Sequence, residues 1–245
     1  MTNIAGCAVL ITGGNRGIGR ALVEEALKRD AARVYAGTRV PFDHPNERVV
    51  PLRLDVTAAD QVRRAAEEVE SRGVLDVLVN NAGIALYDDL SDRSVLERHL
   101  AVNLLGTYEV TNAFLPLLLR SKGAIVNNLS TNSLAPFPLI ASYSVSKAAA
   151  FSLTQSLRAL LAEQGVRVHA VLTGPVDTEM SRGLDAPKAS AQSVARAVFD
   201  GVENDEEDIF PDPTSQSLAE GWRGGVAKAL ELQLAGLSAA QHDKY

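Results

Sequence analysis

The chain has 245 residues with 30 acidic side chains against 24 lysines and arginines, so its formal net charge is −6 at pH 7. This acidity disfavours a nucleic-acid binder, which needs a basic surface to meet phosphates, and no apolar run is long enough to span a bilayer. The N-terminus lacks a signal-peptide pattern and the single cysteine, Cys7, excludes an intramolecular disulfide. We therefore expect a cytoplasmic protein that binds neither nucleic acid nor membrane.

The first half of the chain alternates short apolar runs with longer amphipathic stretches. The apolar runs predict strands at residues 7–12, 33–37, 49–54 and 75–80. The amphipathic stretches predict helices at residues 17–29 and 58–71. Thr57 suits the N-cap of the second helix, whereas Pro51 argues against an interior position for the strand at 49–54.

The second half continues the same alternation. Strands are predicted at residues 124–129, 166–172 and 208–210. Helices are predicted at residues 94–119, 142–164, 192–202 and 218–234. Pro116 is expected to kink the first of these helices or to end it early.

This succession of strands and helices predicts a parallel sheet that carries helices on both faces. A hydrophobic fraction of 46% with only 5% aromatic residues also suits such an α/β fold better than a β-sandwich. No linker-like segment divides the chain, so we expect residues 1–245 to form one doubly wound domain of the Rossmann type with about seven strands. The polar residues 238–245 are expected to be a frayed tail, or to contact a neighbouring subunit.

A glycine-rich segment, residues 12–19 (TGGNRGIG), joins the first predicted strand to the first predicted helix. Glycines at that place allow a positive φ and a close backbone approach to a pyrophosphate, which the helix N-terminus attracts. A purely structural turn is the alternative, because a glycine-rich turn alone is a weak signal. The spacing differs from the GxGxxG of larger two-domain dehydrogenases, and no Gly-Lys-Ser/Thr follows as in a P-loop.

The end of the second predicted strand indicates which dinucleotide is bound. A carboxylate there binds the ribose hydroxyls of NAD, whereas a basic side chain accepts the 2′-phosphate of NADP. The chain offers Thr38 and Arg39 with no acid, and Arg16 in the glycine-rich segment supplies a second guanidinium. The alternative is that Arg39 is an ordinary solvated arginine. We therefore predict NADP(H) rather than NAD(H).

Tyr143 and Lys147 lie four residues apart in a predicted helix, so their side chains share a face. A phenol with an ordinary pKa of about 10 is a poor acid or base at neutral pH, but a neighbouring ammonium stabilises the phenolate and lowers that pKa. Ser130 follows a predicted strand, and ligand sites in open α/β sheets gather at the carboxyl ends of strands.

With these motifs the chain resembles the short-chain dehydrogenase/reductase family over residues 8–210, and Thr38 and Arg39 resemble its NADPH-preferring carbonyl reductases. Residues 12–19 resemble the family's TGxxxGxG, residues 80–83 its NNAG and residues 143–147 its YxxxK. Ser130 precedes the tyrosine by the thirteen residues that the family pattern expects. Residues 173–178 resemble PGxVxT, except that Thr173 replaces the first proline.

The resemblance implies hydride transfer between NADP(H) and a carbonyl or secondary alcohol. It implies that Tyr143 is the general acid and base, that Ser130 binds the carbonyl oxygen, and that Lys147 lowers the tyrosine pKa and binds the nicotinamide ribose. Asn103 is implied to hold a water that relays protons to Lys147. The cofactor-binding residues that it implies are Gly13, Asn15, Arg16, Gly17, Ile18, Gly19, Thr38, Arg39, Asp55, Val56, Asn81, Ala82, Gly83, Tyr143, Lys147, Pro175, Val176 and Thr178.

No metal site is expected, because the chain's histidines are scattered without ligand spacing. They are His44, His99, His169 and His242.

The substrate is expected to be an uncharged, apolar carbonyl compound or alcohol. Leu134 and Phe137 lie in an apolar loop after Ser130, and Met180 follows the predicted nicotinamide segment. These three side chains are candidates for the pocket, although they would equally suit core or interface packing. The resemblance also implies a homodimer or homotetramer.

Two other functions stay open. One is an NAD-dependent alcohol dehydrogenase of the same fold. The other is a nucleotide-binding regulatory protein without turnover, which the presence of both Tyr143 and Lys147 disfavours.

Overall fold

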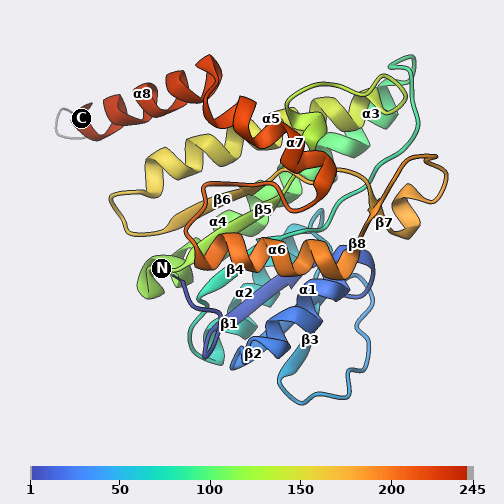
Figure 1. Cartoon of the computed structure of the whole chain (residues 1–245). Helices are drawn as coiled ribbons and strands as arrows, with labels where there is room; N and C mark the ends of the chain where they lie inside the picture. The colour runs from blue at the N-terminus through green and yellow to red at the C-terminus, as the bar shows by residue number, and fades with distance from the viewer. Residues whose placement is uncertain (1, 242–245) are drawn as a thin grey trace.

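The computed structural model describes residues 2–241, and its centre is a seven-stranded sheet in the order β3-β2-β1-β4-β5-β6-β9 (Figure 1). All neighbouring strands are parallel. This confirms the predicted Rossmann-type fold. The strand order reverses between β1 and β4, and the crevice at such a reversal is where open α/β sheets bind ligands. The strands are β1 (Ala8–Thr12), β2 (Arg33–Thr38), β3 (Val49–Arg53), β4 (Val77–Asn80), β5 (Ala124–Asn128), β6 (Arg167–Val171) and β9 (Asp208–Ile209).

Helices cover both faces of the sheet, which explains why its strands are apolar throughout. Alternate residues of β1 point to opposite faces: Val9 and Ile11 belong to one buried cluster, and Ala8 and Leu10 to another. The first cluster includes residues of α1 (Gly17–Lys28) and α6 (Ala191–Glu203). The second includes residues of α2 (Ala59–Ser71), α4 (Gly106–Ser121) and α5 (Ala141–Leu161). A separate pair of short strands, β7 (Val176–Asp177) and β8 (Ala189–Ser190), lies outside the main sheet.

The structure tests two local predictions in the first half of the chain, one for Pro51 in β3 and one for the N-cap of α2. Pro51 does lie in a strand, and β3 tolerates it because it is at the edge of the sheet, where one row of N–H groups has no ladder partner. The prediction that Thr57 caps α2 is wrong. The N-cap is Ala58, and the Thr57 hydroxyl instead donates a hydrogen bond to Asp55 Oδ1 at 2.7 Å.

The helix predicted at residues 94–119 is divided into three parts. These are α3 (Arg93–His99), a π-helical turn η1 (Leu100–Leu105), and α4. The break therefore lies at η1, before Gly106, and not at Pro116, which sits inside α4. A β-carbon at Gly106 would lie 2.7 Å from Val56 Cγ2, so this glycine allows the helix to pack against the segment that follows β3.

The last predicted helix is two helices, α7 (Pro213–Arg223) and α8 (Val226–Gln241), separated at Gly224 and Gly225. Residues 238–241 of the expected tail continue α8, and residues 242–245 lie outside the described part of the chain. Within residues 2–241, none of the helices has the length and apolarity to cross a bilayer.

A buried ionic cluster anchors α8 to the body of the protein. Arg158 of α5 donates to Asp208 of β9 at 2.8 Å and to Glu231 of α8 at 2.5 Å. Lys228 of α8 and the indole N–H of Trp222 both approach Asp208 Oδ2 at 2.8 Å. Burial raises the pKa of the Asp208 carboxyl, but Arg158 and Lys228 outweigh that effect and hold the pKa below its usual value.

Replacing Asp208 with asparagine is therefore expected to lower the free energy of unfolding at pH 7 by about 2 kcal/mol, because the arginine and the lysine of this cluster lose one shared counter-charge and keep Glu231. A depressed carboxyl pKa contributes stability above the unfolded-state pKa of about 3.9, which is lost as the pH falls. The difference between wild type and variant should therefore shrink in urea titrations below about pH 4. Asp205→Asn, at a more exposed ion pair with Arg167, is the control. A difference in the free energy of unfolding between wild type and Asp208→Asn that stays constant down to pH 3 would contradict this account.

Candidate active site

The glycine-rich segment forms a tight cradle at the start of α1. Gly13 and Gly17 have φ values of 70° and 52°, which disfavour other residues. A β-carbon at Gly19 would lie 2.1 Å from the Gly13 carbonyl oxygen, so only glycine fits there. A β-carbon at Gly17 would lie 3.3 Å from Thr178 Cγ2, which places Thr178 beside the cradle. Asn15 is exposed at the turn, and Ile18 packs its side chain against the core.

Hydrogen bonds join the cradle to the residues that follow β4. The Thr12 hydroxyl accepts from the N–H groups of Asn81 and Ala82 at 2.9 and 3.0 Å. The Asn81 amide donates to the Thr12 carbonyl at 2.9 Å and accepts from Asn128 of β5 at 2.9 Å. Thr173, the departure from the family's proline, donates to Asn128 Oδ1 at 2.9 Å. Sequence reasoning missed Asn128 and the role of Thr173, because their partners lie on separate strands.

The residues predicted to bind the adenosine end lie beside the ends of β2 and β3. Thr38 is 3% exposed and donates its hydroxyl to the Val40 carbonyl at 2.8 Å, while Arg39 is exposed. The backbone N–H of Asp55 donates to Gln61 Oε1 at 3.1 Å, and Val56 is buried.

The guanidinium of Arg16 is already engaged in this structure. It forms an exposed ion pair with Glu179 at 3.0 Å, immediately after Thr178. Pro175 and Val176 precede Thr178, and Val176 belongs to the core cluster beneath α1 and α6. The segment after Thr178 is thus joined to the glycine cradle through Arg16, one of the two arginines predicted to bind the 2′-phosphate.

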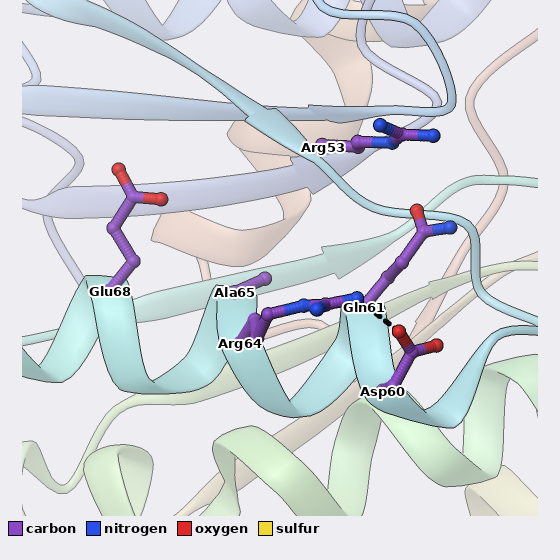
Figure 2. A pocket seen from close by; sticks show the side chains of 6 residues that line it. All are labelled: Arg53, Asp60, Gln61, Arg64, Ala65 and Glu68. Carbon is purple, nitrogen blue, oxygen red and sulfur yellow. Dashed lines mark hydrogen bonds and ion pairs between the residues drawn. The ribbon is translucent and has the colours of Figure 1, made fainter.

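A hollow of about 490 Å³ lies near this end of the sheet, between the end of β3 and α2 (Figure 2). Arg64 pairs with Asp60 across its floor. None of the predicted site residues lines it, so this hollow is not the candidate site, which lies at the carboxyl ends of the strands. The lining residues are Arg53, Asp60, Gln61, Arg64, Ala65 and Glu68.

Tyr143 and Lys147 come from the first turns of α5. Lys147 is only 6% exposed, and its ammonium donates to the Asn128 carbonyl at 2.7 Å. The ammonium nitrogen lies 5.8 Å from the centroid of the Tyr143 ring. Burial lowers the pKa of Lys147 to about 8. Burial also raises the pKa of the half-buried Tyr143 phenol, and the neighbouring Ser130 hydroxyl offsets part of that rise. At neutral pH this pair is therefore a protonated phenol beside an ammonium.

Asn103 lies in the π-helical turn, where its side chain ties three segments together. Its amide donates to the Ile84 carbonyl and to Ser146 Oγ, and its oxygen accepts from the Ile84 N–H, each at 2.9 Å. A β-carbon at Gly83 would lie 3.2 Å from Asn103 Oδ1 and 3.8 Å from the Lys147 nitrogen, so these residues are neighbours. The role of Asn103 in holding a water stays a prediction.

The three pocket candidates lie in different environments. Leu134 packs against an interior cluster that includes Phe151 and Phe210. Phe137 is half-buried, and Met180 is 52% exposed. Sequence reasoning missed Tyr87, which is 65% exposed and whose hydroxyl lies 3.5 Å from where a β-carbon of Gly183 would be.

His99 is fully buried against the Tyr143 ring, with 6.3 Å between ring centroids. Its Nε2 accepts from the Leu86 N–H at 3.0 Å and its Nδ1 donates to the Val95 carbonyl at 2.8 Å, so the imidazole supports the site wall. The positions of the histidines in the sequence did not indicate this role, because His99 and Tyr143 meet only in the folded chain. No cluster of three metal-ligating side chains occurs among residues 2–241, and His242 lies outside them.

Known proteins resemble this chain in sequence and fold. A family model described as short chain dehydrogenase matches residues 7–189. Estradiol 17-beta-dehydrogenase 2 from Rattus norvegicus is 34% identical over 195 residues, which are 73% of this chain but 50% of that protein, so the chain spans about half of its length. The structure of a short chain dehydrogenase from Burkholderia cenocepacia J2315 in complex with NADP has a TM-score of 0.86 and 36% identity, covering 95% of this chain and 99% of that one. ElxO with NADP bound has a TM-score of 0.78 and 28% identity, with 86% and 99% covered.

Proposed function

Because the chain belongs to the short-chain dehydrogenase family of oxidoreductases, we propose that it transfers a hydride between NADP(H) and a carbonyl or secondary alcohol, with Tyr143 as general acid and base. The observation that carries the proposal is the Tyr143–Lys147–Ser130 group at the carboxyl end of β5, joined through Asn128 and Asn81 to the glycine cradle.

The residues of the cradle fit a dinucleotide. Gly19 leaves no room for a side chain beside Gly13, and the first N–H groups of α1 have no side-chain cap, which suits a pyrophosphate. The Lys147 ammonium has three donors and makes one hydrogen bond within the described residues, so it can also bind a ribose hydroxyl. When bound, the cofactor supplies or accepts the hydride.

The chain's own residues move the proton. In reduction, the Tyr143 phenol donates its proton to the carbonyl oxygen while the Ser130 hydroxyl donates a hydrogen bond to the same oxygen. The Lys147 ammonium stabilises the phenolate that remains. In oxidation, the phenolate takes the proton of the alcohol. Since burial raises the phenol pKa, Tyr143 holds its proton at neutral pH and can act as the acid in reduction.

The preference for NADPH rests on Arg39 and Arg16, with no acidic residue in the segment that ends β2, residues 37–39. Two structural neighbours are described with NADP bound, which supports this choice. Arg16 would exchange its ion pair with Glu179 for the 2′-phosphate, at little cost because exposed pairs contribute at most about 1 kcal/mol.

The substrate is proposed to be an apolar carbonyl compound, since Tyr87, Leu139 and Met180 expose apolar surface on the segments around the site. A homodimer or homotetramer and a cytoplasmic location stay predictions.

The test of the proposed function is a panel of ketones and aldehydes incubated with NADPH, with absorbance loss at the reduced nicotinamide band as the readout. We expect turnover with apolar carbonyls and slower turnover with charged ones and with NADH. No turnover with any carbonyl would contradict the proposal. A rate that is higher with NADH would favour the NAD-dependent alternative.

The pH dependence of the reduction rate is expected to follow the ionisation of the Lys147 side chain. A lysine whose pKa is lowered to about 8 is charged below that pH and neutral above it. Loss of the charge destabilises the phenolate, so kcat/KM should be level below about pH 8 and fall above it. Lys147→Arg keeps its charge throughout, so its residual kcat/KM should lack this decline. A wild-type kcat/KM that is unchanged up to pH 10 would contradict the assignment.

A further inference from the structure

The extended segment at residues 84–88, which we call the strap, is fixed at every second residue. Ile84 exchanges backbone hydrogen bonds with the Asn103 side chain, and the Leu86 N–H donates to His99. Asp88 contacts Ser142 and the loop before it. The strap therefore connects η1, α3 and α5, which are the elements around Tyr143.

Asp88 contacts the beginning of α5 in several ways. Its carboxylate oxygens accept from the Ser142 N–H at 3.1 and 3.2 Å and from the Ser142 hydroxyl. Its own N–H donates to the Leu139 carbonyl at 3.2 Å, and Asp88 and Ile140 form an isolated parallel bridge. Ser142 is fully buried and Asp88 is half-buried, so these contacts are partly shielded from solvent.

The sequence around α5 explains why this contact matters. The N-cap position is Ile140, whose side chain offers no hydrogen bond to the free N–H groups of the first turn. Asp88 supplies that acceptor from 54 residues away in the chain. An aspartate at a helix N-terminus satisfies these N–H groups and complements the helix dipole.

The two groups that must meet at the reacting oxygen have separate origins. Tyr143 is in the first turn of α5, next to Ser142, whereas Ser130 follows β5. The loop between them, residues 131–140, is exposed or half-buried and bonds α5 one turn further on, where the Phe137 N–H donates to Ser144 Oγ at 3.1 Å. The geometry points to Asp88 as a positioning residue: its carboxylate fixes the first turn of α5 and so holds the Tyr143 hydroxyl against Ser130. This inference rests on the proposed function for its effect on turnover.

A matched control separates positioning from ordinary helix stabilisation. Asp92 also caps a helix, accepting from the Ser94 N–H at 2.8 Å at the start of α3. It is four residues from Asp88 in sequence, but the helix it caps does not carry Tyr143. Asp92→Ala therefore removes a similar cap from a different helix.

The experiment compares Asp88→Ala, Asp88→Asn and Asp92→Ala. Hydrogen exchange of the peptide at residues 140–147 should be faster in Asp88→Ala and unchanged in Asp92→Ala. With NADPH and a ketone substrate, kcat of Asp88→Ala should fall about 10- to 100-fold, as expected when a reacting group is displaced by about 1 Å. The KM for NADPH should stay within about twofold, because the cradle is untouched. Asp88→Asn keeps an oxygen that accepts from Ser142, so it should recover most of kcat.

Four outcomes would overturn the inference. They are unchanged exchange at residues 140–147 in Asp88→Ala, a kcat within twofold of wild type, an unrescued Asp88→Asn, and an equal loss of kcat in Asp92→Ala. If Asp88→Ala does not fold, Ser142→Ala removes the hydroxyl donor but keeps the bonds from the Ser142 N–H, so exchange and kcat should change in the same direction by a smaller amount. Values equal to those of the wild type would then overturn the inference. If the wild type reduces no carbonyl, the proposed function fails. The exchange measurements alone then show whether Asp88 fixes the first turn of α5.

Discussion

The Tyr143→Phe variant is expected to lose carbonyl reduction by about 10³-fold in kcat, within the range that a positioned general acid contributes. Phenylalanine keeps the ring that packs against His99 and removes only the hydroxyl that interacts with Ser130. The glycine cradle and Lys147 stay in place, so the dissociation constant for NADPH, measured by quenching of protein fluorescence, should stay within about threefold.

Tyr108→Phe is the matched control, since Tyr108 is an exposed tyrosine on α4. Its kcat should equal that of the wild type. A Tyr143→Phe variant that keeps a tenth or more of the wild-type kcat would rule out Tyr143 as the acid, whereas loss of NADPH binding would show that the substitution damages the cradle.

The Thr38→Asp variant is expected to change the cofactor preference from NADPH towards NADH. A carboxylate at the end of β2 accepts hydrogen bonds from the ribose hydroxyls of NADH and repels a 2′-phosphate. The ratio of kcat/KM for NADPH to that for NADH should fall by at least about 100-fold, which corresponds to about 2.8 kcal/mol.

Thr38 is buried and its hydroxyl bonds the Val40 carbonyl, so part of any loss could come from a distorted loop. Thr38→Asn controls for this, because asparagine has the size of aspartate without its charge. The ratio of the two cofactors should change in Thr38→Asp and stay near the wild-type value in Thr38→Asn. Equal ratios in both variants would contradict the proposed 2′-phosphate site.

Features that depend on neighbouring residues could be predicted from the sequence. The alternating apolar runs predicted the parallel sheet, and the glycine spacing from Gly13 to Gly19 placed the cradle between β1 and α1. The four-residue interval placed Tyr143 and Lys147 on one face of α5. The separation of α7 from α8 also had a local signal, the Gly224–Gly225 pair, which the prediction of a continuous helix overlooked.

Features that depend on tertiary contacts could not be predicted. The π-helical turn that holds Asn103 widens the hydrogen-bonded ring over only six residues, too short a stretch for the apolar pattern to reveal. Asp88 and His99 look like ordinary loop and helix residues until the fold brings them against α5. The burial that lowers the Lys147 pKa likewise comes from the packing of α5 on the sheet, and no sequence interval records it.

The most direct measurement follows the hydride itself. NADPH deuterated at both C4 positions of the nicotinamide is incubated with the enzyme and an apolar ketone, and the product is examined by mass spectrometry and proton NMR. We predict an alcohol with one deuterium on the carbinol carbon, formed by the wild type and only in trace amounts by Tyr143→Phe. An alcohol without deuterium at that carbon, or equal yields from the two proteins, would contradict direct hydride transfer assisted by Tyr143.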